Sequence, residues 1–421
     1  MLLEIDFVKN FFRYLGTYSL RYILGFFITT AVINYLGDYE FGKFSYLISV
    51  ASLIGGFASL GFNSTIPTFL KLSSSKEEKN AIMSTAFISL LAAGFLNGLI
   101  FLIFIKFTDP DYLLLAIIYS LIFPLGSSNS IKYFFEFNAD LKFITIINNL
   151  ALAISFASKL LGLYLDKPLS WFILCITIEQ IVIFVSYLIL YRRTVNGALF
   201  EGFSFLILNK LLKKSLPFLL SGIMITMYMK IDQIMIKWIL GEESNGVYSA
   251  TIRLVEVFYF LPVIIQTTYY PFILKTISNK TLTKIKMLGQ YKLILIISSI
   301  ITTFLIFFAK DILYVLYGTE SASSTTLLQV YGFSLILIAI GTIRNHLIYY
   351  YQLSNFYFLI TVIGVFINII LNLIFIPYFG LIGCAYATII SQLFVSIISS
   401  LFNKILKDDL LFLGMNILKK K

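Results

Sequence analysis

The chain has 421 residues, of which 59% are hydrophobic and only 13% are charged. A soluble domain usually has about 25% charged and 45–50% apolar residues, so this composition excludes an ordinary soluble enzyme or binding domain and indicates a membrane protein. The net charge of +11 lies in short clusters between apolar runs, and both cysteines fall inside such runs. These placements favour neither a nucleic-acid surface nor a disulfide framework.

Twelve apolar runs, separated by charge clusters or by Pro and Gly, follow one another along the chain. Each is long enough to cross a hydrocarbon core of about 30 Å as a helix. The expected spans are 15–36, 44–66, 81–105, 112–135, 143–164, 169–190, 215–240, 246–272, 288–308, 325–350, 356–376 and 381–403. The first run is too long for a signal peptide and lacks a small-residue cleavage site, so we expect a retained helix.

Basic residues concentrate in the loops on the side of the N-terminus. Loops 71–79 and 192–214 hold several Lys or Arg each, whereas the opposite side holds isolated residues such as Lys106 and Lys167. Cytoplasmic loops of membrane proteins carry an excess of Lys and Arg. We therefore predict that both termini are cytoplasmic.

One short segment occurs twice along the chain. Residues 36–45 read LGDYEFGKFS, and residues 240–249 read LGEESNGVYS. One explanation is that any two membrane hairpins need a glycine turn outside and a basic end inside. The other, which the gapless continuation of the match favours, is an internal duplication of a six-helix bundle.

A duplication predicts an all-α integral membrane protein with about 12 transmembrane helices in two parallel-repeat six-helix lobes. Residues 1–195 would form the N-terminal lobe, 196–214 a cytoplasmic linker and 215–421 the C-terminal lobe. Parallel repeats of this kind are typical of transporters that move one half against the other around a central site.

Three segments carry a resemblance to a known family. They are LGDYEFGKFSY at 36–46, the run from MKIDQIMIKW to FYFLP at 229–262, and LNLIFIPYFGLIGCAYATIIS at 371–391. The chain resembles polysaccharide transporters of the O-antigen flippase (Wzx-like) type. They share a superfamily, the multidrug/oligosaccharidyl-lipid/polysaccharide exporters, with the multidrug and toxin extruders (MATE-like) and the lipid II flippases.

The resemblance implies a function and its partners. We expect a transporter of the bacterial cytoplasmic (inner) membrane that flips an undecaprenyl-pyrophosphate-linked oligosaccharide repeat unit for O-antigen, capsular or exopolysaccharide assembly. Its partners would be this lipid-linked oligosaccharide, the bilayer, and the polysaccharide polymerase and chain-length machinery, with no nucleic acid. No cofactor or metal is expected, and coupling to an H⁺ or Na⁺ gradient stays open.

Eight ionisable residues lie inside the expected spans. A charge at the bilayer centre costs at least about 2.5–3.5 kcal/mol, so such residues normally face protein or a water-filled cavity. The candidate substrate-cavity residues are Arg21, Lys159, Lys230, Arg253 and Arg344, and the candidate coupling or gating residues are Asp232, Glu256 and Glu179. Their positive excess fits an anionic head group such as a pyrophosphate.

Each of these residues also has a structural explanation. Lys159 can snorkel to the interface, as can Arg21 and Arg344 near the cytoplasmic ends of their spans. Arg253 and Glu256 are three residues apart and can pair on one helix face. Lys230 and Asp232 lie deepest in their span, and Lys230 is the residue that we expect to contact the anionic cargo.

Enzymatic functions find little support in the sequence. It has no P-loop, no Cys/His cluster and no long outer loop, so we do not expect an enzyme. The first alternative is an ion-coupled drug/cation antiporter of the multidrug and toxin extrusion type, for which a net acidic cavity would be expected. The second is a lipid II flippase, which commonly has two further helices.

Overall fold

The structure is a computed structural model. Its backbone is described for residues 5–138, 140–195, 199–274, 276, 280–318, 321–351 and 353–408. Within these ranges, the side chains of 5–22, 270–272, 274, 280–281, 284, 346, 349–350 and 354 are not described.

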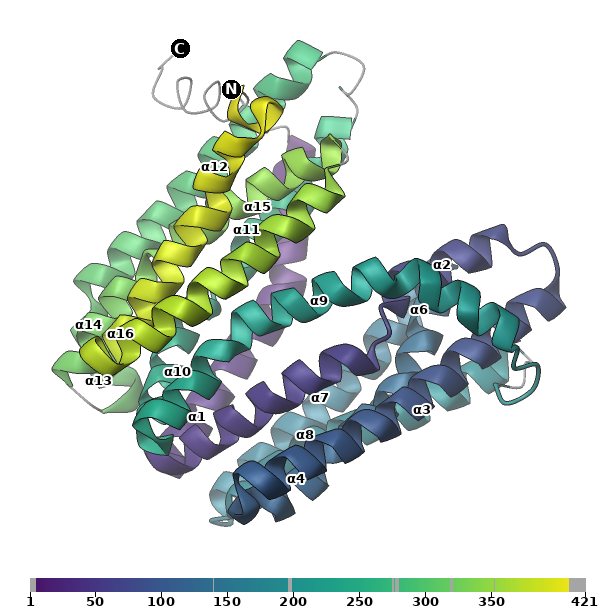
Figure 1. Ribbon diagram of the computed structural model, residues 1–421, viewed down its shortest axis with the longest axis horizontal. Helices are drawn as coiled ribbons and strands as arrows, with labels where there is room; N and C mark the ends of the chain where they lie inside the picture. Colours follow the sequence, from purple (N-terminus) through teal and green to yellow (C-terminus); the bar gives the residue numbers. More distant parts are fainter. Residues whose placement is uncertain are drawn as a thin grey trace. The chain divides into compact units, whose positions relative to one another are not determined.

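Helices make up the regular structure, and no strand occurs in the described ranges (Figure 1). Ten helical segments of this part of the chain are long and apolar enough to cross a membrane. The first and the last of them, Ile23–Leu72 and Asn355–Phe402, are much longer than one bilayer crossing needs. Each bends at a glycine, and counting both arms of each gives the twelve expected crossings. The all-α membrane fold is therefore confirmed.

The two bends arise from glycines in conformations that other residues avoid. Helix α1 (Ile5–Ala58) is interrupted at Gly37, with φ 72° and ψ 171°, and helix α16 (Ser354–Ser396) at Gly380, with φ 60° and ψ −139°. An L-residue with a β-carbon rarely adopts a positive φ, so glycine at these positions allows the chain to reverse between two helices.

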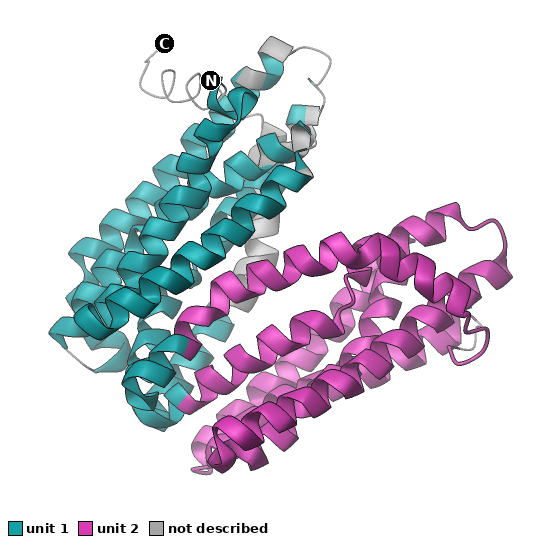
Figure 2. Ribbon diagram, in the orientation of Figure 1, with its two compact units in different colours: residues 1–42, 235–421 teal, residues 43–234 magenta. Residues whose placement is uncertain are grey.

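The chain forms two compact units, residues 43–234 (unit 2) and residues 1–42 with 235–421 (unit 1) (Figure 2). Helices α1 and α9 (Phe205–Leu240) pass from one unit into the other. Residues 205–214, expected in a linker, are thus the first turns of α9, and Leu211 there is fully buried. The expected lobe boundaries stay a prediction from the sequence repeat.

Unit 2 contains residues 43–58 of the second arm of α1, residues 205–234 of α9 and the helices between them. These are α2 (Phe62–Leu72), α3 (Lys76–Thr108), η1 (Pro110–Tyr112), α4 (Leu113–Ser120), α5 (Ile122–Leu125), η2 (Gly126–Ser128), α6 (Asn129–Phe137), α7 (Leu141–Tyr164) and α8 (Leu169–Val195). Their core gathers apolar side chains from α2, α3, α6 and α8, among them Phe62, Phe87 and Tyr187. Ser75 begins α3 as an N-cap, accepting a hydrogen bond from the Glu78 amide.

Helix α3 shows how unit 2 meets the membrane and packs inside. Leu99, Ile103 and Phe107 are exposed along one stripe, as expected of side chains that face lipid. On the packed face, a β-carbon at Gly94 would lie only 2.5 Å from the carbonyl oxygen of Phe123. Gly94 and Gly98 form a small-residue pair four apart, which lets a neighbouring helix approach closely. This close approach fixes the position of α4 and α5.

Unit 1 contains the first arm of α1, the end of α9 and the later helices. These are α10 (Glu242–Glu256), α11 (Phe260–Leu274), α12 (Lys280–Phe307), α13 (Ala309–Tyr317), α14 (Ala322–Gly332), α15 (Ser334–Tyr350), α16 and η3 (Ile398–Phe402). One core cluster joins α11, α12 and α15 through residues such as Ile265, Ile294 and Ile343.

The short helix α13 ties two elements of unit 1 together. Asn34 of α1 donates from Nδ2 to the carbonyl of Leu316 at 2.7 Å. The Tyr317 hydroxyl donates to the carbonyl of Ala250 in α10 at 3.1 Å. Because both bonds cross between helices, α13 fixes the first arm of α1 and α10 at the same end of unit 1.

Candidate functional site

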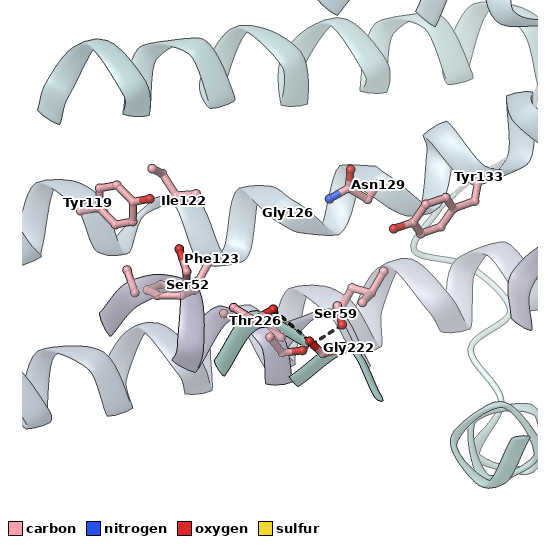
Figure 3. Close-up of a pocket in the computed structure, with 15 residues that line it drawn as sticks. Ser52, Ser59, Tyr119, Ile122, Phe123, Gly126, Asn129, Tyr133, Gly222 and Thr226 are labelled. Carbon is pink, nitrogen blue, oxygen red and sulfur yellow. Dashed lines mark hydrogen bonds between the residues drawn. The ribbon is translucent and has the colours of Figure 1, made fainter. Parts of the chain in front are cut away.

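A cavity of about 470 Å³ opens inside unit 2 (Figure 3). Its walls come from the second arm of α1, from α3, from the segment α4 to α6, and from α9. The lining residues are Ala51, Ser52, Gly55, Gly56, Ala58, Ser59, Leu90, Tyr119, Ile122, Phe123, Gly126, Asn129, Tyr133, Gly222 and Thr226. The polar side chains among them, which are Ser52, Ser59, Tyr119, Asn129, Tyr133 and Thr226, are all uncharged.

Glycines bring the walls of this cavity together. A β-carbon at Gly55 would lie 3.1 Å from the ring of Phe123, and one at Gly56 would lie 3.3 Å from Cγ1 of Ile223. At Gly222, by contrast, a β-carbon would meet no atom within 4 Å. Gly55 and Gly56 therefore serve close packing, whereas Gly222 leaves space that belongs to the cavity.

The broken helix from α4 to α6 supplies the polar groups. Pro124 has no amide hydrogen, so it interrupts the hydrogen-bond ladder of the helix. The hydroxyls of Ser127, Ser128 and Ser130 donate to the carbonyls of Pro124, Leu125 and Ser127, at 2.8, 2.9 and 2.8 Å. The hydroxyl hydrogens of these serines are therefore used by backbone carbonyls of the same segment.

Asn129, within the same run, is exposed and makes no hydrogen bond to any described residue. It is therefore the polar side chain of this segment that is left for the cavity.

The remaining polar groups of the cavity divide into two kinds. Ser52, Ser59 and Thr226 each donate their hydroxyl hydrogen to a carbonyl of their own helix, at 2.7, 2.9 and 2.9 Å. The oxygens of Ser52 and Thr226 are consequently available to the cavity as acceptors, whereas the Ser59 oxygen already accepts from the Gly61 amide at 3.3 Å. The hydroxyls of Tyr119 and Tyr133 form no hydrogen bond with described residues and can still donate. Figure 3 shows the tyrosines and Asn129 along one wall and the Ser and Thr residues along another.

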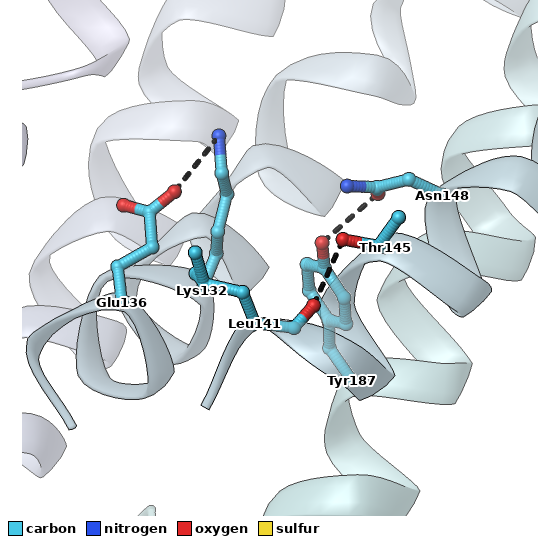
Figure 4. A network of polar contacts seen from close by, with 6 residues as sticks. All are labelled: Lys132, Glu136, Leu141, Thr145, Asn148 and Tyr187. Carbon is cyan, nitrogen blue, oxygen red and sulfur yellow. Dashed lines mark hydrogen bonds and ion pairs between the residues drawn. The ribbon is translucent and has the colours of Figure 1, made fainter. Parts of the chain in front are cut away.

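None of the residues that line this cavity is charged. The nearest charged pair of α6 is satisfied internally, because Lys132 Nζ lies 3.6 Å from Glu136 Oε1 (Figure 4). In the same view, the Tyr187 hydroxyl donates to Asn148 Oδ1 at 2.9 Å and joins α8 to α7. The polar groups of Figure 4 are thus paired with one another, and none of the charged ones lines the cavity.

Lys230 lies on the face of α9 that carries Gly222 and Thr226, because positions i, i+4 and i+8 of a helix share one side. Its side chain is half-buried and makes no hydrogen bond or ion pair with any described residue. Asp232 is buried, with 5% of its surface exposed. Two positions along a helix differ by about 200°, so Lys230 and Asp232 point to different sides.

The other ionisable candidates of unit 2 lie apart from this face. Lys159 of α7 is half-buried, and its ammonium lies 5.7 Å from the centre of the Phe156 ring. Glu179 of α8 is half-buried, and no hydrogen bond or ion pair joins it to a described residue. The structure does not bring Lys159 or Glu179 into the lining of the cavity.

In unit 1, Arg253 contacts α1 and not the acid on its own helix. Its Nη2 donates to Thr29 Oγ1 at 3.2 Å. Glu256 is half-buried, and Arg253 and Glu256 form no ion pair in the described structure. The alternative that these two side chains pair on one helix face is thus not realised as a direct ion pair among the described residues, and Arg253 joins α10 to the first arm of α1.

Arg344 of α15 is buried, with 2% of its surface exposed. Its Nη1 donates to Ser399 Oγ at 3.3 Å, and its Nη2 donates to Asn345 Oδ1 at 2.9 Å. Nε has no hydrogen-bond partner in the described structure. The side chain of Arg21 lies outside the described residues, so its placement stays a prediction.

The repeated glycine segments meet inside unit 1. Gly241 precedes α10 with φ 90° and ψ 179°, close to the conformation of Gly37. A β-carbon at Gly42 would overlap the carbonyl of Glu242, and one at Gly246 would overlap the carbonyl of Asp38. The two helices therefore cross in a symmetric way. Gly42 lies against Glu242, four residues before Gly246, and Gly246 lies against Asp38, four residues before Gly42.

The sequence did not point to the residues that line the cavity. The candidates from the sequence are charged, and no charged residue lines the cavity. Two signals were nevertheless present, namely Pro124 inside an expected span and the polar run GSSNS at 126–130 directly after it. A proline followed by several hydroxyl and amide residues in an apolar run indicates a broken helix that lines a cavity or a protein interface.

Solved structures of similar fold are transporters. An inward-facing multidrug resistance MATE family transporter of the MOP superfamily aligns with a TM-score of 0.70 and 16% identity, over 94% of this chain and 95% of that one. The lipid II flippase MurJ in an inward closed conformation aligns with a TM-score of 0.70 and 19% identity, over 96% and 90%. An outward-facing MATE transporter aligns with a TM-score of 0.60 and 15% identity, over 98% and 96%. Likeness at this identity shows the fold.

The sequence gives the family. No curated protein sequence matches the chain significantly. The sequence model of the polysaccharide biosynthesis protein family matches residues 7–277, which is more than half of the chain. The resemblance to polysaccharide transporters is thereby confirmed, and the chain belongs to the polysaccharide biosynthesis protein family.

Proposed function

We propose that this protein flips an undecaprenyl-pyrophosphate-linked oligosaccharide repeat unit across the cytoplasmic membrane by alternating access. The product would feed the assembly of an O-antigen, a capsule or an exopolysaccharide. Membership of a polysaccharide biosynthesis family and a fold shared with transporters support this proposal. Both point to transport and not to an enzymatic step.

The observation that carries the proposal is the state of Lys230. It is a half-buried cation in a membrane-spanning helix, without an ion pair or hydrogen bond to any described residue. An ionisable side chain at such a place normally has a partner or a function. Because it shares its helix face with an uncharged polar cavity, an anionic group attached to a sugar fits this surface better than a cationic drug does.

The remaining basic candidates are given different parts in this proposal. Arg253 and Arg344 hold helices of unit 1 in place, since both donate to neutral oxygens of neighbouring residues. Arg21 and Lys159 are proposed as additional contacts for the anionic cargo. For Asp232, Glu179 and Glu256, we propose roles in coupling to an ion gradient or in gating.

A deletion in the host tests the function. We expect loss of surface polysaccharide together with accumulation of undecaprenyl-linked repeat units inside the cell, measured by glycan staining and by mass spectrometry of extracted lipids. Normal surface polysaccharide in a strain without a second flippase would contradict the proposal. If accumulation affects lipid II alone, the chain is a lipid II flippase, and if only drug tolerance changes, it is an extruder.

Complementation of that strain tests Lys230. A partly desolvated contact between an ammonium and a phosphate is worth about 1.5–3 kcal/mol, so Lys230→Gln should reduce export by about 10- to 100-fold at normal protein level. Lys230→Arg should retain most export because it keeps the charge. The matched control is Lys237→Gln, on the same helix, where the lysine is 3.9 Å from Glu242 Oε1. Equal export by Lys230→Gln and wild type would contradict the role.

Orientation belongs to the same proposal, with both termini cytoplasmic. Reporters fused after Lys214 and after Lys286 should give cytoplasmic signals, and one placed at Glu243 should give an external signal. An external signal at Lys214 would contradict the proposed orientation and the duplicated lobes, since both halves would have to begin on the same side.

A further inference from the structure

We propose that the uncharged cavity of unit 2 is a glycan subsite, which holds a neutral, hydroxyl-bearing sugar ring of the lipid-linked cargo. This inference rests on the proposed function and adds to it the place where the sugar is selected. The residues that would contact the sugar are Ser52, Tyr119, Asn129, Tyr133 and Thr226. None of them was a candidate from the sequence.

The hydrogen-bonding groups of the cavity match those of a sugar. Each sugar hydroxyl donates one hydrogen bond and accepts others, so a complementary wall needs both donors and acceptors. Asn129, Tyr119 and Tyr133 provide donors that are unused in the described structure. Ser52 and Thr226 provide acceptor oxygens, because their hydrogens are already donated to the carbonyls of Ile48 and Gly222. An alkyl chain would leave the donors of Asn129, Tyr119 and Tyr133 without partners.

The size and the aromatic content of the cavity agree with this ligand. A volume of about 470 Å³ lies within the range of about 300–1,000 Å³ that is usual for small-molecule sites. Tyr119 and Tyr133 combine an apolar ring face with a polar hydroxyl, and a sugar ring likewise combines apolar C–H faces with polar edges. The tyrosines can therefore pack on the ring and hydrogen bond to its edge.

The absence of charge from the lining excludes other occupants. A bare cation or a pyrophosphate placed in an uncharged cavity would lose hydration without gaining a counter-charge, which is costly. A neutral sugar loses only neutral hydrogen bonds to water, and the lining replaces them. The cavity therefore suits the glycan portion of the cargo and not its pyrophosphate.

Lys230 lies close to this cavity along the length of α9. The second arm of α1 and α9 run antiparallel, because Gly56 lies against Ile223 and Ser49 Oγ hydrogen bonds to Gln233 Oε1. Residue 230 of α9 therefore lies at about the level of Ser52, a lining residue. A cargo whose phosphate contacts Lys230 would have its first sugars beside this cavity.

The test compares two lipids on the purified full-length protein. The first probe is the pool of undecaprenyl-linked oligosaccharide extracted from the deletion strain, and the second is undecaprenyl pyrophosphate without sugar. Kd is measured for both in the same detergent. We expect the wild type to bind the glycan-bearing pool more tightly. Asn129→Leu combined with Tyr133→Phe should reduce that preference by about 10-fold and leave Kd for undecaprenyl pyrophosphate unchanged.

Filling the cavity provides a second test that needs no polar substitution. Gly222→Leu places a side chain in open space of the cavity, so the folded structure should tolerate it while the preference for the glycan disappears. Ser221→Leu is the matched control, since it adds the same side chain one position around α9, at a residue that does not line the cavity. The control should keep the wild-type preference.

The outcomes distinguish failure of the proposed glycan subsite from failure of the proposed flippase function. Lys230→Gln should weaken binding of both probes by similar factors, because it acts on the shared pyrophosphate. If the Asn129/Tyr133 and Gly222 variants keep the wild-type preference, the subsite is wrong while the flippase function stands. If the wild type binds both probes equally, the subsite is again wrong. If the wild type binds neither, the proposed function itself fails.

Discussion

The two glycine segments of unit 1 have the same backbone but different side-chain contacts. Gly37 and Gly241 both have positive φ and extended ψ, and Gly42 and Gly246 approach each other's helices reciprocally. Between the glycines the segments diverge. Asn245 is buried and donates from Nδ2 to the carbonyl of Gly42 at 2.9 Å, whereas its counterpart Phe41 is a buried aromatic residue.

This difference shows which parts of a repeated segment the geometry dictates. A positive φ with an extended ψ, as at Gly37 and Gly241, is essentially restricted to glycine, and a β-carbon at Gly42 or Gly246 would overlap a backbone carbonyl. A buried position next to such a contact can instead be filled by an apolar ring or by a hydrogen-bonding amide. Glycine therefore recurs in register at 37 and 241 and at 42 and 246, while position 41 and position 245 have changed.

The largest effect is expected where the two helices cross. Gly42→Ala or Gly246→Ala places a β-carbon on a backbone carbonyl, which cannot move as a flexible side chain could. The helices would have to separate, at a cost of about 3 kcal/mol or more. We expect a clear fall in Tm and in the yield of folded protein in detergent, similar for both variants because the contacts are reciprocal.

Gly222→Ala is the control for that experiment. It makes the same substitution in a helix, at a position where a β-carbon meets no atom within 4 Å. Alanine is favoured over glycine in helices by about 0.5–1 kcal/mol, so Tm should stay constant or rise slightly. A Gly42→Ala variant as stable as Gly222→Ala would show that the close crossing is absent in the folded protein.

A smaller effect is expected at the turns that precede the helices. Gly37→Ala and Gly241→Ala meet no neighbouring atom, so their cost comes from the backbone conformation alone. An L-residue held in a sparsely populated region costs about 1–3 kcal/mol. Both variants should lower Tm by similar amounts, and by less than the Gly42 variant does. A Tm unchanged in either variant would contradict the kinked conformation at that turn.

The repeated glycines could be predicted from the sequence, because a positive φ or a close backbone contact requires a residue without a β-carbon. The same holds for the twelve crossings, since apolar runs of bilayer length follow from composition. The charge of a residue does not by itself state its surroundings. Arg344 is an intramembrane cation in the sequence, and in the structure it is buried and donates to the neutral oxygens of Ser399 and Asn345.

The cavity of unit 2 was missed because its lining comes from helices distant in sequence and consists of common residues. Tyr119, Asn129 and Thr226 are ordinary in any membrane protein. The packing of Gly55, Gly56 and Gly94 against neighbouring helices and the break at Pro124 bring such groups to one place. A single sequence states the residue types but not these approaches between helices.

The smallest effect is expected at the residue that breaks the symmetry of the repeat. Asn245→Ala removes the hydrogen bond from Nδ2 to the Gly42 carbonyl and the longer one that Oδ1 accepts from Ser249 Oγ at 3.4 Å. A neutral hydrogen bond contributes about 0.5–1.5 kcal/mol. We expect a modest decrease in Tm without loss of folded protein. Ser244→Ala is the matched control, because the neighbouring Ser244 makes no hydrogen bond with a described residue and should leave Tm unchanged. If Asn245→Ala were as damaging as Gly246→Ala, the hydrogen bond and not the close crossing of backbones would hold the two helices together.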